Sequence, residues 1–472
     1  MNLAGKDRSV YVVAFILVAY TIMFSGVGIW RHYHFLHERS GDLLIFEQVV
    51  YNTAHGNFFY NNFSAQSHFG DHNSAMLAIM VPFSYLFPTP YVLYTFTVLS
   101  ISISAIPIYL IAAEYLGSKL MALFLMAGYL MLPGLVGQVY MSFHEINLVL
   151  PFLTFAFYFF LKEKFYPFVA MMMLGMLVKE DVALTMFMFA PYALIKKRSC
   201  RWYLTPVILS VSWFLLSIKL VIPHFNTRNQ YGVGLGYFSS FGATIPEIIS
   251  TIVRTPMQTL AVMWSRANYL YVLLLPFCFV LPFISTEIMF SIPSILFNLL
   301  ADSGRFRLHG FGVGSTEYVF PMHMSIMASA LLYIALIMAI KNSAALLPQR
   351  GKEITVALVI CTLAFTCGAD RFLVVKHLYK QYDDLQYVPT VEAVNNALSR
   401  IPLDATVVSD RGISTHLYDR KESYYDFGDI KKADYVVITT PDVPAVNANP
   451  DFNGKFEPVY LEQNVGLFKR KR

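Results

Sequence analysis

The residues best suited to chemistry are carboxylates and imidazoles that stand in short groups between long apolar stretches of the chain. They are Asp42 in the first polar stretch, His68 with Asp71 and His72, the pair His144-Glu145, and the triplet Lys179-Glu180-Asp181. Charge within or beside a lipid bilayer is costly, so such groups need a functional or structural reason. An active site at the membrane surface is the simplest reason if all of them lie on one side.

Asp42 follows Gly41 and begins a segment whose apolar positions 43, 44, 46, 49 and 50 predict a short amphipathic helix lying on the membrane. Because aspartate is favoured at helix starts, a helix cap is the simplest structural interpretation. The functional interpretation is a general base that removes a proton from an acceptor hydroxyl. Glu47 lies one turn further along and, although it is expected to face elsewhere, it is included among the residues that line the site.

Imidazole and carboxylate groups occur together at His68, Asp71 and His72. This combination suits a divalent metal ion or the capture of a hydroxyl-rich ligand. The spacing is not a diagnostic metal motif, so solvated loop residues that stabilise a turn are the alternative. If a divalent metal ion is present, its predicted ligands are Asp71, His72 and Glu180.

Three consecutive charges at Lys179-Glu180-Asp181 interrupt an otherwise apolar stretch. They are costly there unless they face water or one another, so a structural salt bridge is the alternative to a functional role. Lys179 could bind a phosphate as a point charge. Glu180 or Asp181 could hold a metal ion or orient an acceptor. His68, His144, Glu145 and Asp181 are therefore expected to line the site.

Two arginines, Arg305 and Arg307, precede a glycine-rich stretch at 310–315. Guanidinium groups suit a phosphate or pyrophosphate that arrives from the lipid leaflet, so both are predicted phosphate ligands together with Lys179. The glycines neither follow a strand nor open a helix as a dinucleotide fingerprint does, which predicts a loop. Tyr318, just beyond them, is expected to line the site.

Composition indicates a membrane protein. Hydrophobic residues make up 56% of the 472 residues and charged residues only 14%, outside the usual range of soluble domains. The net charge of +5 is explained by loop topology and gives no reason to expect nucleic-acid binding. Candidate membrane spans lie at 10–30, 91–113, 118–138, 146–161, 165–178, 181–195, 202–222, 267–285, 286–300, 321–341 and 353–373. Several of them are shorter than the roughly 20 residues that a straight crossing needs.

Lysine and arginine residues in the short loops fall on one side if the segment 75–87 is interfacial or re-entrant. This arrangement predicts about eleven crossings, a cytoplasmic amino terminus and an extracytoplasmic carboxyl terminus. Residues 1–373 then form the membrane domain, with a long first outer loop at 31–74. Residues 374–472 alternate short strands with polar helices, with buried strands predicted at 406–409 and 435–439, and predict a small soluble extracytoplasmic α/β domain.

The ordered set of motifs resembles a family of predicted membrane proteins of unknown function that are relatives of GT-C glycosyltransferases. The resemblance covers most of the chain, and it is carried by Asp42, Phe46, Gln48, Asn52-Thr53-Ala54-His55-Gly56, Gly70-Asp71-His72, Phe143-His144, Lys179-Glu180-Asp181, Pro293, Asn298 and the segment from Ser409 to Tyr425. The GT-C superfamily includes oligosaccharyltransferase subunits, protein O-mannosyltransferases and the aminoarabinose transferase of lipid A. In these enzymes a first-loop acid acts at the active site and a polyprenyl-phosphate-linked sugar is the usual donor. The resemblance therefore implies that Asp42 is catalytic.

The sequence thus predicts an α-helical polytopic membrane protein with a GT-C-like fold in the cell membrane. Its expected function is transfer of a sugar from a lipid-linked donor to a glycan, lipid or protein acceptor on the outer face, with inversion. A divalent metal ion is the only cofactor considered. A transporter or lipid flippase would use the same charges along a translocation path, but such sites usually lie near the bilayer midplane within paired repeats, and no repeat is visible. A non-catalytic assembly subunit is the third alternative.

Overall fold

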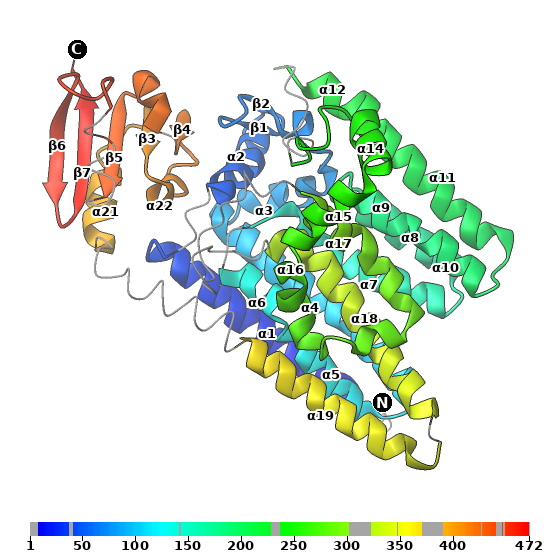
Figure 1. Ribbon diagram of the computed structural model, residues 1–472. Coiled ribbons are helices and arrows are strands. Elements are labelled where there is room, and N and C mark those ends of the chain that lie inside the picture. The colour runs from blue at the N-terminus through cyan, green and yellow to red at the C-terminus, as the bar shows by residue number, and fades with distance from the viewer. Residues whose placement is uncertain are drawn as a thin grey trace.

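A bundle of helices makes up most of the molecule, and a small β-sheet lies beside one end of it (Figure 1). The computed structural model describes residues 8–36, 41–140, 143–227, 237–301, 322–346, 348–370, 390–425, 427–439, 446 and 449–471. The predicted domain boundary at 373/374 and the predicted site residues Arg305, Arg307 and Tyr318 lie outside these described residues.

The helices of the bundle follow the apolar stretches of the sequence. Their bounds are α1 Arg8–Tyr33, α2 Asp42–Ala54, α3 Val81–Ser84, α4 Thr89–Leu116, α5 Lys119–Leu130, α6 Pro133–Tyr140, α7 Val149–Leu161, α8 Phe165–Met176, α9 Val182–Phe187, α10 Phe189–Ile195, α11 Cys200–Leu216, α12 Ile222–Phe225, α14 Ile245–Arg254, α15 Pro256–Ser265, α16 Asn268–Leu274, α17 Ile292–Leu300, α18 Met322–Leu346 and α19 Gly351–Asp370.

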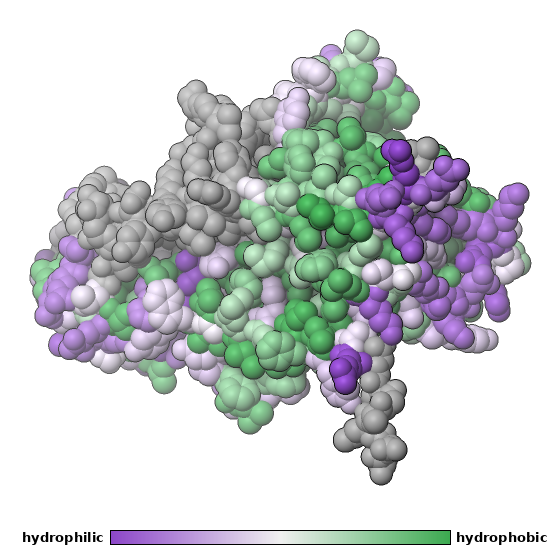
Figure 2. All heavy atoms as spheres, turned by 90° about the horizontal axis from the view of Figure 1, so that it is seen from below, coloured by the Kyte–Doolittle hydropathy of each residue, from purple (hydrophilic) through white to green (hydrophobic). Residues whose placement is uncertain are grey.

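Within the described residues, five helices are long and apolar enough to cross a membrane, or six if α5 and α6, which meet at 43°, form one broken span. The predicted count of about eleven crossings is therefore not confirmed. The difference arises because several predicted spans are short apolar helices, such as α7 and α8, or are divided into shorter helices, as 181–195 is into α9 and α10. Hydrophobic residues cover much of the middle of the surface seen from below, and hydrophilic residues gather toward its right and left edges (Figure 2).

The core of the bundle is built on α18, whose residues between Ile326 and Ile340 are almost all inaccessible to solvent. It packs against α4, α6 and α7. A helix that is apolar on every face and buried on every face fits the centre of a bundle rather than its lipid-facing surface. Of the polar groups, Glu145 lies in the segment that leads directly into α7.

The segments between the helices that carry the polar groups form short local structures. Strands β1 (Tyr60–Asn61) and β2 (Gln66–Ser67) pair as an antiparallel hairpin after α2. Short 3-10 segments follow at His68–Gly70 and Ala75–Met80, and another, at Glu145–Leu148, leads into α7. A π-helical segment at Ser217–Val221 continues α11. Such segments often occur where a helix serves a functional site.

The carboxyl-terminal part contains a five-stranded sheet in the order β4-β3-β5-β7-β6. Its helices and strands are α21 Val391–Leu398, β3 Thr406–Ser409, α22 Arg411–Ser414, β4 Glu422–Tyr424, β5 Tyr435–Thr439, β6 Phe456–Glu462 and β7 Val465–Arg470. Strand β3 is parallel to β4 and β5, whereas β7 is antiparallel to β5 and β6. Helix α21 packs on one face through the buried Val394. The strands predicted at 406–409 and 435–439 are confirmed.

This sheet contacts the first polar loop of the bundle directly. The Gln48 side-chain amide of α2 donates to the carbonyl of Ser423, 3.2 Å away. The rings of His32 and His416 stack with centroids 4.1 Å apart, and Phe63 stacks on Tyr425 at 5.5 Å. The carboxyl-terminal sheet therefore lies beside the start of α2, where Asp42 is placed.

Candidate functional site

Asp42 is the first residue of α2, and its position depends on the glycine before it. Gly41 is the N-cap residue, with a left-handed φ of 86° and no side-chain cap hydrogen bond. A Cβ atom at this position would also lie 2.7 Å from the ring of Tyr425. Both the backbone conformation and the space require glycine. Asp42 is therefore not the helix cap, and its side chain stays 40% exposed.

Helix α2 is enclosed by protein rather than lying on a membrane surface. Its apolar residues Leu43, Leu44, Phe46, Val49 and Val50 are all at most 5% exposed. The prediction of a short amphipathic helix is correct in its position, but the environment predicted for it was wrong. The apolar face is covered by the bundle and by the β1–β2 hairpin, which an isolated sequence pattern does not distinguish from lipid.

The side chain of Phe46 connects α2 to the other polar groups. Phe46 is four residues after Asp42 and so lies on the same face of the helix. Its ring contacts Phe143, His144 and His68 at centroid distances of 5.2, 6.1 and 5.4 Å. The Asp42 Oδ2 and His144 Nε2 atoms are 3.7 Å apart. Burial lowers the pKa of His144 although Asp42 opposes the shift, so the imidazole is neutral near pH 7.

His72 and Glu180, which are 108 residues apart, form the closest polar contact of the site. The His72 Nδ1 and Glu180 Oε1 atoms are 2.8 Å apart, and the backbone N–H of Asn73 donates to Glu180 Oε2 at 3.0 Å. Burial would raise the pKa of Glu180, but His72 and Lys179 lower it to about 2. Burial would likewise lower the pKa of His72, yet Glu180 helps to raise it above its usual value. Each of the two shifts favours the charged form of its side chain.

Lys179 is an internal partner of the same cluster. Its Nζ atom lies 2.8 Å from Glu145 Oε1, and both side chains are largely buried. Burial would lower the pKa of Lys179, but Glu145, Asp181 and Glu180 raise it. Two of the three charges of the triplet are therefore paired across the site, with Glu145 and His72, as the salt-bridge interpretation expected. A phosphate would have to compete with Glu145 for Lys179.

His68 and Asp71 have different surroundings although they are close in sequence. The ring of His68 is buried, its centroid lies 5.8 Å from that of His72, and neither of its nitrogens hydrogen-bonds to a described residue. Burial lowers the pKa of His68 to about 4. The carboxylate of Asp71 instead accepts from Ser64 Oγ at 2.6 Å and from Gln66 Nε2 at 3.1 Å. It therefore stabilises the hairpin loop.

The predicted metal ligands do not form one set in this structure. Asp71 is held by the hairpin, whereas His72 and Glu180 bond to each other. Among the described residues, no three histidine, cysteine, aspartate or glutamate side chains are grouped so that they could hold a metal ion. Dependence on a divalent metal ion stays a prediction, and no step below is derived through one.

Glu47 faces away from the cluster. It is fully buried, its carboxylate oxygens make no hydrogen bond to a described residue, and burial together with Asp419 raises its pKa well above the usual value. This placement agrees with the prediction that Glu47 faces elsewhere. It disagrees with the prediction that Glu47 lines the site. Asp181, the last residue of the triplet, immediately precedes α9, and burial raises its pKa to about 6.

Three residues that support the site were not singled out for their own chemistry. The Asn73 side chain donates to Ser217 Oγ at 2.8 Å and so connects the first loop to the π-helical segment. Gln48 links α2 to both Asn62 and Ser423. Arg31 of α1 donates to the carbonyls of Leu36 and of Tyr140, the last residue of α6. Only their polar type beside apolar stretches could have pointed to them.

Comparison with known proteins agrees with this fold. A family model described as "Predicted membrane protein (DUF2079)" matches residues 32–457. Among solved structures, ArnT from Cupriavidus metallidurans bound to undecaprenyl phosphate is 10% identical, with a TM-score of 0.55 over 96% of this chain and 97% of that chain. The same protein in the apo state gives 10% identity and a TM-score of 0.52 over 96% and 98%. No curated protein matches the chain. The likeness to ArnT shows a GT-C fold.

Proposed function

We propose that this chain, which belongs to the DUF2079 family of predicted membrane proteins and has an ArnT-like GT-C fold, is a membrane glycosyltransferase. Its donor is a sugar carried on a polyprenyl phosphate, and its acceptor is a hydroxyl group presented at the membrane surface. One solved structure of ArnT holds undecaprenyl phosphate, which supports this donor class for a chain with the same fold.

The observation that carries the proposal is the exposed carboxylate of Asp42. It lies beside His144, which precedes Glu145 of the buried charged cluster. Asp42 is 40% exposed, whereas Glu145 and Glu180 of this cluster are paired with Lys179 and His72, respectively. A carboxylate that keeps access to solvent can receive a proton from a substrate. A carboxylate already held by a buried cation serves instead to fix the geometry around it.

The reaction would proceed by a single displacement at the anomeric carbon. Asp42 accepts the proton of the acceptor hydroxyl while the acceptor oxygen forms a bond to that carbon. The bond between the anomeric carbon and the donor phosphate oxygen breaks, and the electron pair leaves with the lipid phosphate. A phosphate is a good leaving group and needs no acid. Attack from the face opposite the phosphate inverts the anomeric configuration.

The neighbouring residues would position Asp42 and not react themselves. Phe46 holds His144 on the face of α2 that carries Asp42. A neutral His144 at 3.7 Å can keep the carboxylate in place without neutralising it. The roles of Lys179, Arg305 and Arg307 in binding the donor phosphate, and of the carboxyl-terminal sheet in holding the acceptor, are part of the proposal.

The experiment is a comparison in cells from which the gene has been deleted. Wild-type protein, Asp42→Asn and Asp404→Asn are each expressed, and lipid-linked sugars and surface glycans are measured by mass spectrometry. Asp404 is an exposed carboxylate of the turn before β3, so Asp404→Asn is a matched control. We expect the wild type and the control to restore one glycan, and Asp42→Asn to leave the lipid-linked sugar unused.

Because an exposed carboxylate contributes little to folding, Asp42→Asn should unfold at the wild-type temperature. Transfer should fall by about a hundredfold or more, as expected for loss of a general base. A correctly folded Asp42→Asn protein that restores the glycan to the wild-type level would refute the assignment.

A further inference from the structure

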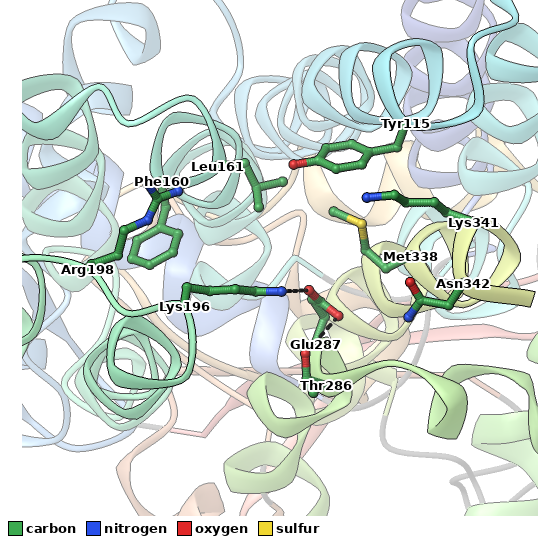
Figure 3. A pocket seen from close by; sticks show the side chains of 10 residues that line it. All are labelled: Tyr115, Phe160, Leu161, Lys196, Arg198, Thr286, Glu287, Met338, Lys341 and Asn342. Atoms are coloured by element: carbon green, nitrogen blue, oxygen red, sulfur yellow. Dashed lines mark hydrogen bonds and ion pairs between the residues drawn. The ribbon is translucent and has the colours of Figure 1, made fainter. Parts of the chain in front are cut away.

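A pocket of about 180 Å³ lies among helix ends that the proposed reaction does not use (Figure 3). It is lined by Tyr115 of α4, by Lys196 and Arg198 after α10, by Glu287, and by Lys341 and Asn342 of α18. In Figure 3 the ammonium group of Lys341 and the hydroxyl of Tyr115 both point into the space between these elements. Polar groups from four separate parts of the chain therefore meet in one concave site.

The pocket lies at the opposite end of α7 from the candidate active site. Glu145 begins the segment that leads into α7, and Leu161, which lines the pocket, is the last residue of α7. This length of helical backbone spans roughly 25 Å. That is close to the hydrocarbon thickness of a bilayer. If the active-site end of this helical segment lies at one membrane face, the pocket lies near the headgroups of the other leaflet, on the side of the loops whose lysines and arginines are predicted to be cytoplasmic.

The pocket carries more positive than negative charge. Among its lining residues are three cations and one carboxylate, Glu287. Glu287 lies 3.2 Å from Lys196 Nζ and also accepts from the hydroxyl of Tyr192. Arg198 pairs with the exposed Glu163 at the rim. In the part of the chain that the structure describes, Lys341 has no carboxylate partner, and its Nζ atom lies 4.4 Å from the centre of the Tyr115 ring.

Helix dipoles explain some of this charge but not the position of Lys341. Helices α7 and α10 end here, and cations offset the partial negative charge of such ends. Lys162 and Lys164 follow α7, and Lys197 follows α10, so both ends have cations that do not line the pocket. Lys341 lies more than one turn before the end of α18 at Leu346. Its side chain is thus available to an anion in the pocket.

Exposed apolar residues lie close in the chain to residues that line the pocket. Leu194 and Ile195 precede Lys196 and are 58% and 52% exposed, and Ile284, next to the segment of Glu287, is 48% exposed. Apolar side chains beside a group of cations suit a ligand that has acyl chains and an anionic head. Basic pockets between membrane helices on the cytoplasmic side are known to accept anionic lipid headgroups.

We infer that this pocket binds a phosphate group at the membrane face opposite the candidate active site, with Lys341 as the cation that contacts it. Lys196, already held by Glu287, and Arg198 complete the positive surround, and the Tyr115 hydroxyl and Asn342 amide can donate to phosphate oxygens. The phosphate comes either from an anionic phospholipid or from a soluble phosphate compound. The inference is independent of the proposed transfer reaction.

The test uses purified full-length protein and three variants. Lys341→Gln removes the unpaired cation, Lys341→Arg keeps the charge, and Lys197→Gln removes a charge from the same face without touching the pocket. In one arm, native mass spectrometry measures binding of phosphatidylglycerol against phosphatidylcholine. In the other, thermal unfolding of protein in phosphatidylcholine nanodiscs is followed with inorganic phosphate, with sodium sulfate as the ionic-strength control.

If a lipid supplies the phosphate, phosphatidylglycerol binds preferentially, Lys341→Gln weakens it about fivefold or more, and Lys341→Arg and Lys197→Gln do not. If a soluble compound supplies it, inorganic phosphate raises the unfolding temperature more than sulfate does, and only Lys341→Gln abolishes the difference. The inference is overturned if Lys341→Gln, shown to be folded by size-exclusion chromatography, binds both probes as the wild type does. It is equally overturned if Lys197→Gln causes the same loss.

Discussion

The contact between His72 and Glu180 should be one of the strongest electrostatic contributions to the stability of this protein. It joins the first polar loop to the segment between α8 and α9, and Asn73 adds a backbone hydrogen bond to the same carboxylate. Glu180→Gln keeps the shape and the acceptor for Asn73 but removes the charge. We expect this single substitution to destabilise the folded state substantially.

The magnitude follows from the pKa of Glu180. A decrease from 4.5 to about 2 corresponds to about 3 kcal/mol of stability. This is within the range of about 3–5 kcal/mol found when one partner of a buried ion pair is removed. Because the pKa in the folded state is lowered, the contribution is present in full above pH 4.5 and is lost as the pH falls toward 2. The free energy of unfolding of the wild type should therefore fall between pH 5 and pH 3.

The assay is reversible unfolding in mixed detergent micelles, measured for the wild type, Glu180→Gln, His72→Gln and the double variant. The double-mutant cycle should give a coupling energy of about 2 kcal/mol, since the two side chains are in direct contact. Glu114→Gln is the control, because Glu114 and Lys162 form an exposed ion pair 3.0 Å apart. Its cost should be below about 1 kcal/mol.

The reasoning would be refuted if Glu180→Gln cost no more than Glu114→Gln, or if the cycle were additive. It would also be refuted if Glu180→Gln kept the wild-type loss of stability between pH 5 and pH 3.

Three further predictions use the same preparation or intact cells. Burial raises the pKa of Asp181 from 3.8 to about 6, so the ionised carboxylate destabilises the folded state increasingly as the pH rises through that range. Asp181→Asn should therefore be more stable than the wild type by about 2–3 kcal/mol at pH 7 but not near pH 4. Equal pH profiles of stability for the two proteins would contradict this. Burial raises the pKa of Glu47 above its usual 4.5, so its carboxylate should lower wild-type stability increasingly as the pH rises from about 4.5, where this residue ionises in the unfolded chain. A Glu47→Gln protein that retained the same decrease would show that another group causes it. Single-cysteine proteins with Ala65→Cys, Leu403→Cys or the native Cys200 test the topology. An impermeant maleimide should label the first two on intact cells, but Cys200 only after permeabilisation. The reverse pattern would show that the predicted topology is inverted.

The sequence alone determined the class of protein, the position of its apolar helices and the strands at 406–409 and 435–439, because these depend on local periodicity and composition. It also indicated a GT-C-like fold, in agreement with the similarity in fold to ArnT. It did not determine how many apolar helices are long enough to cross a membrane. Whether a short apolar stretch crosses a bilayer or packs inside a bundle depends on its neighbours, which no local pattern records.

The tertiary structure decided which charged groups pair with one another. Glu180 and Asp71 each stand beside an ionisable residue in the sequence and are both predicted metal ligands. In the structure Glu180 contacts His72 across the bundle, whereas Asp71 accepts a hydrogen bond from Ser64 in its own loop. Lys179 is paired with Glu145, whose side chain is 3% exposed, whereas the side chain of Asp42 is 40% exposed. Such pairings join residues up to 108 positions apart. Sequence spacing contains no information on these distances, because they are set by how the helices and the carboxyl-terminal sheet pack.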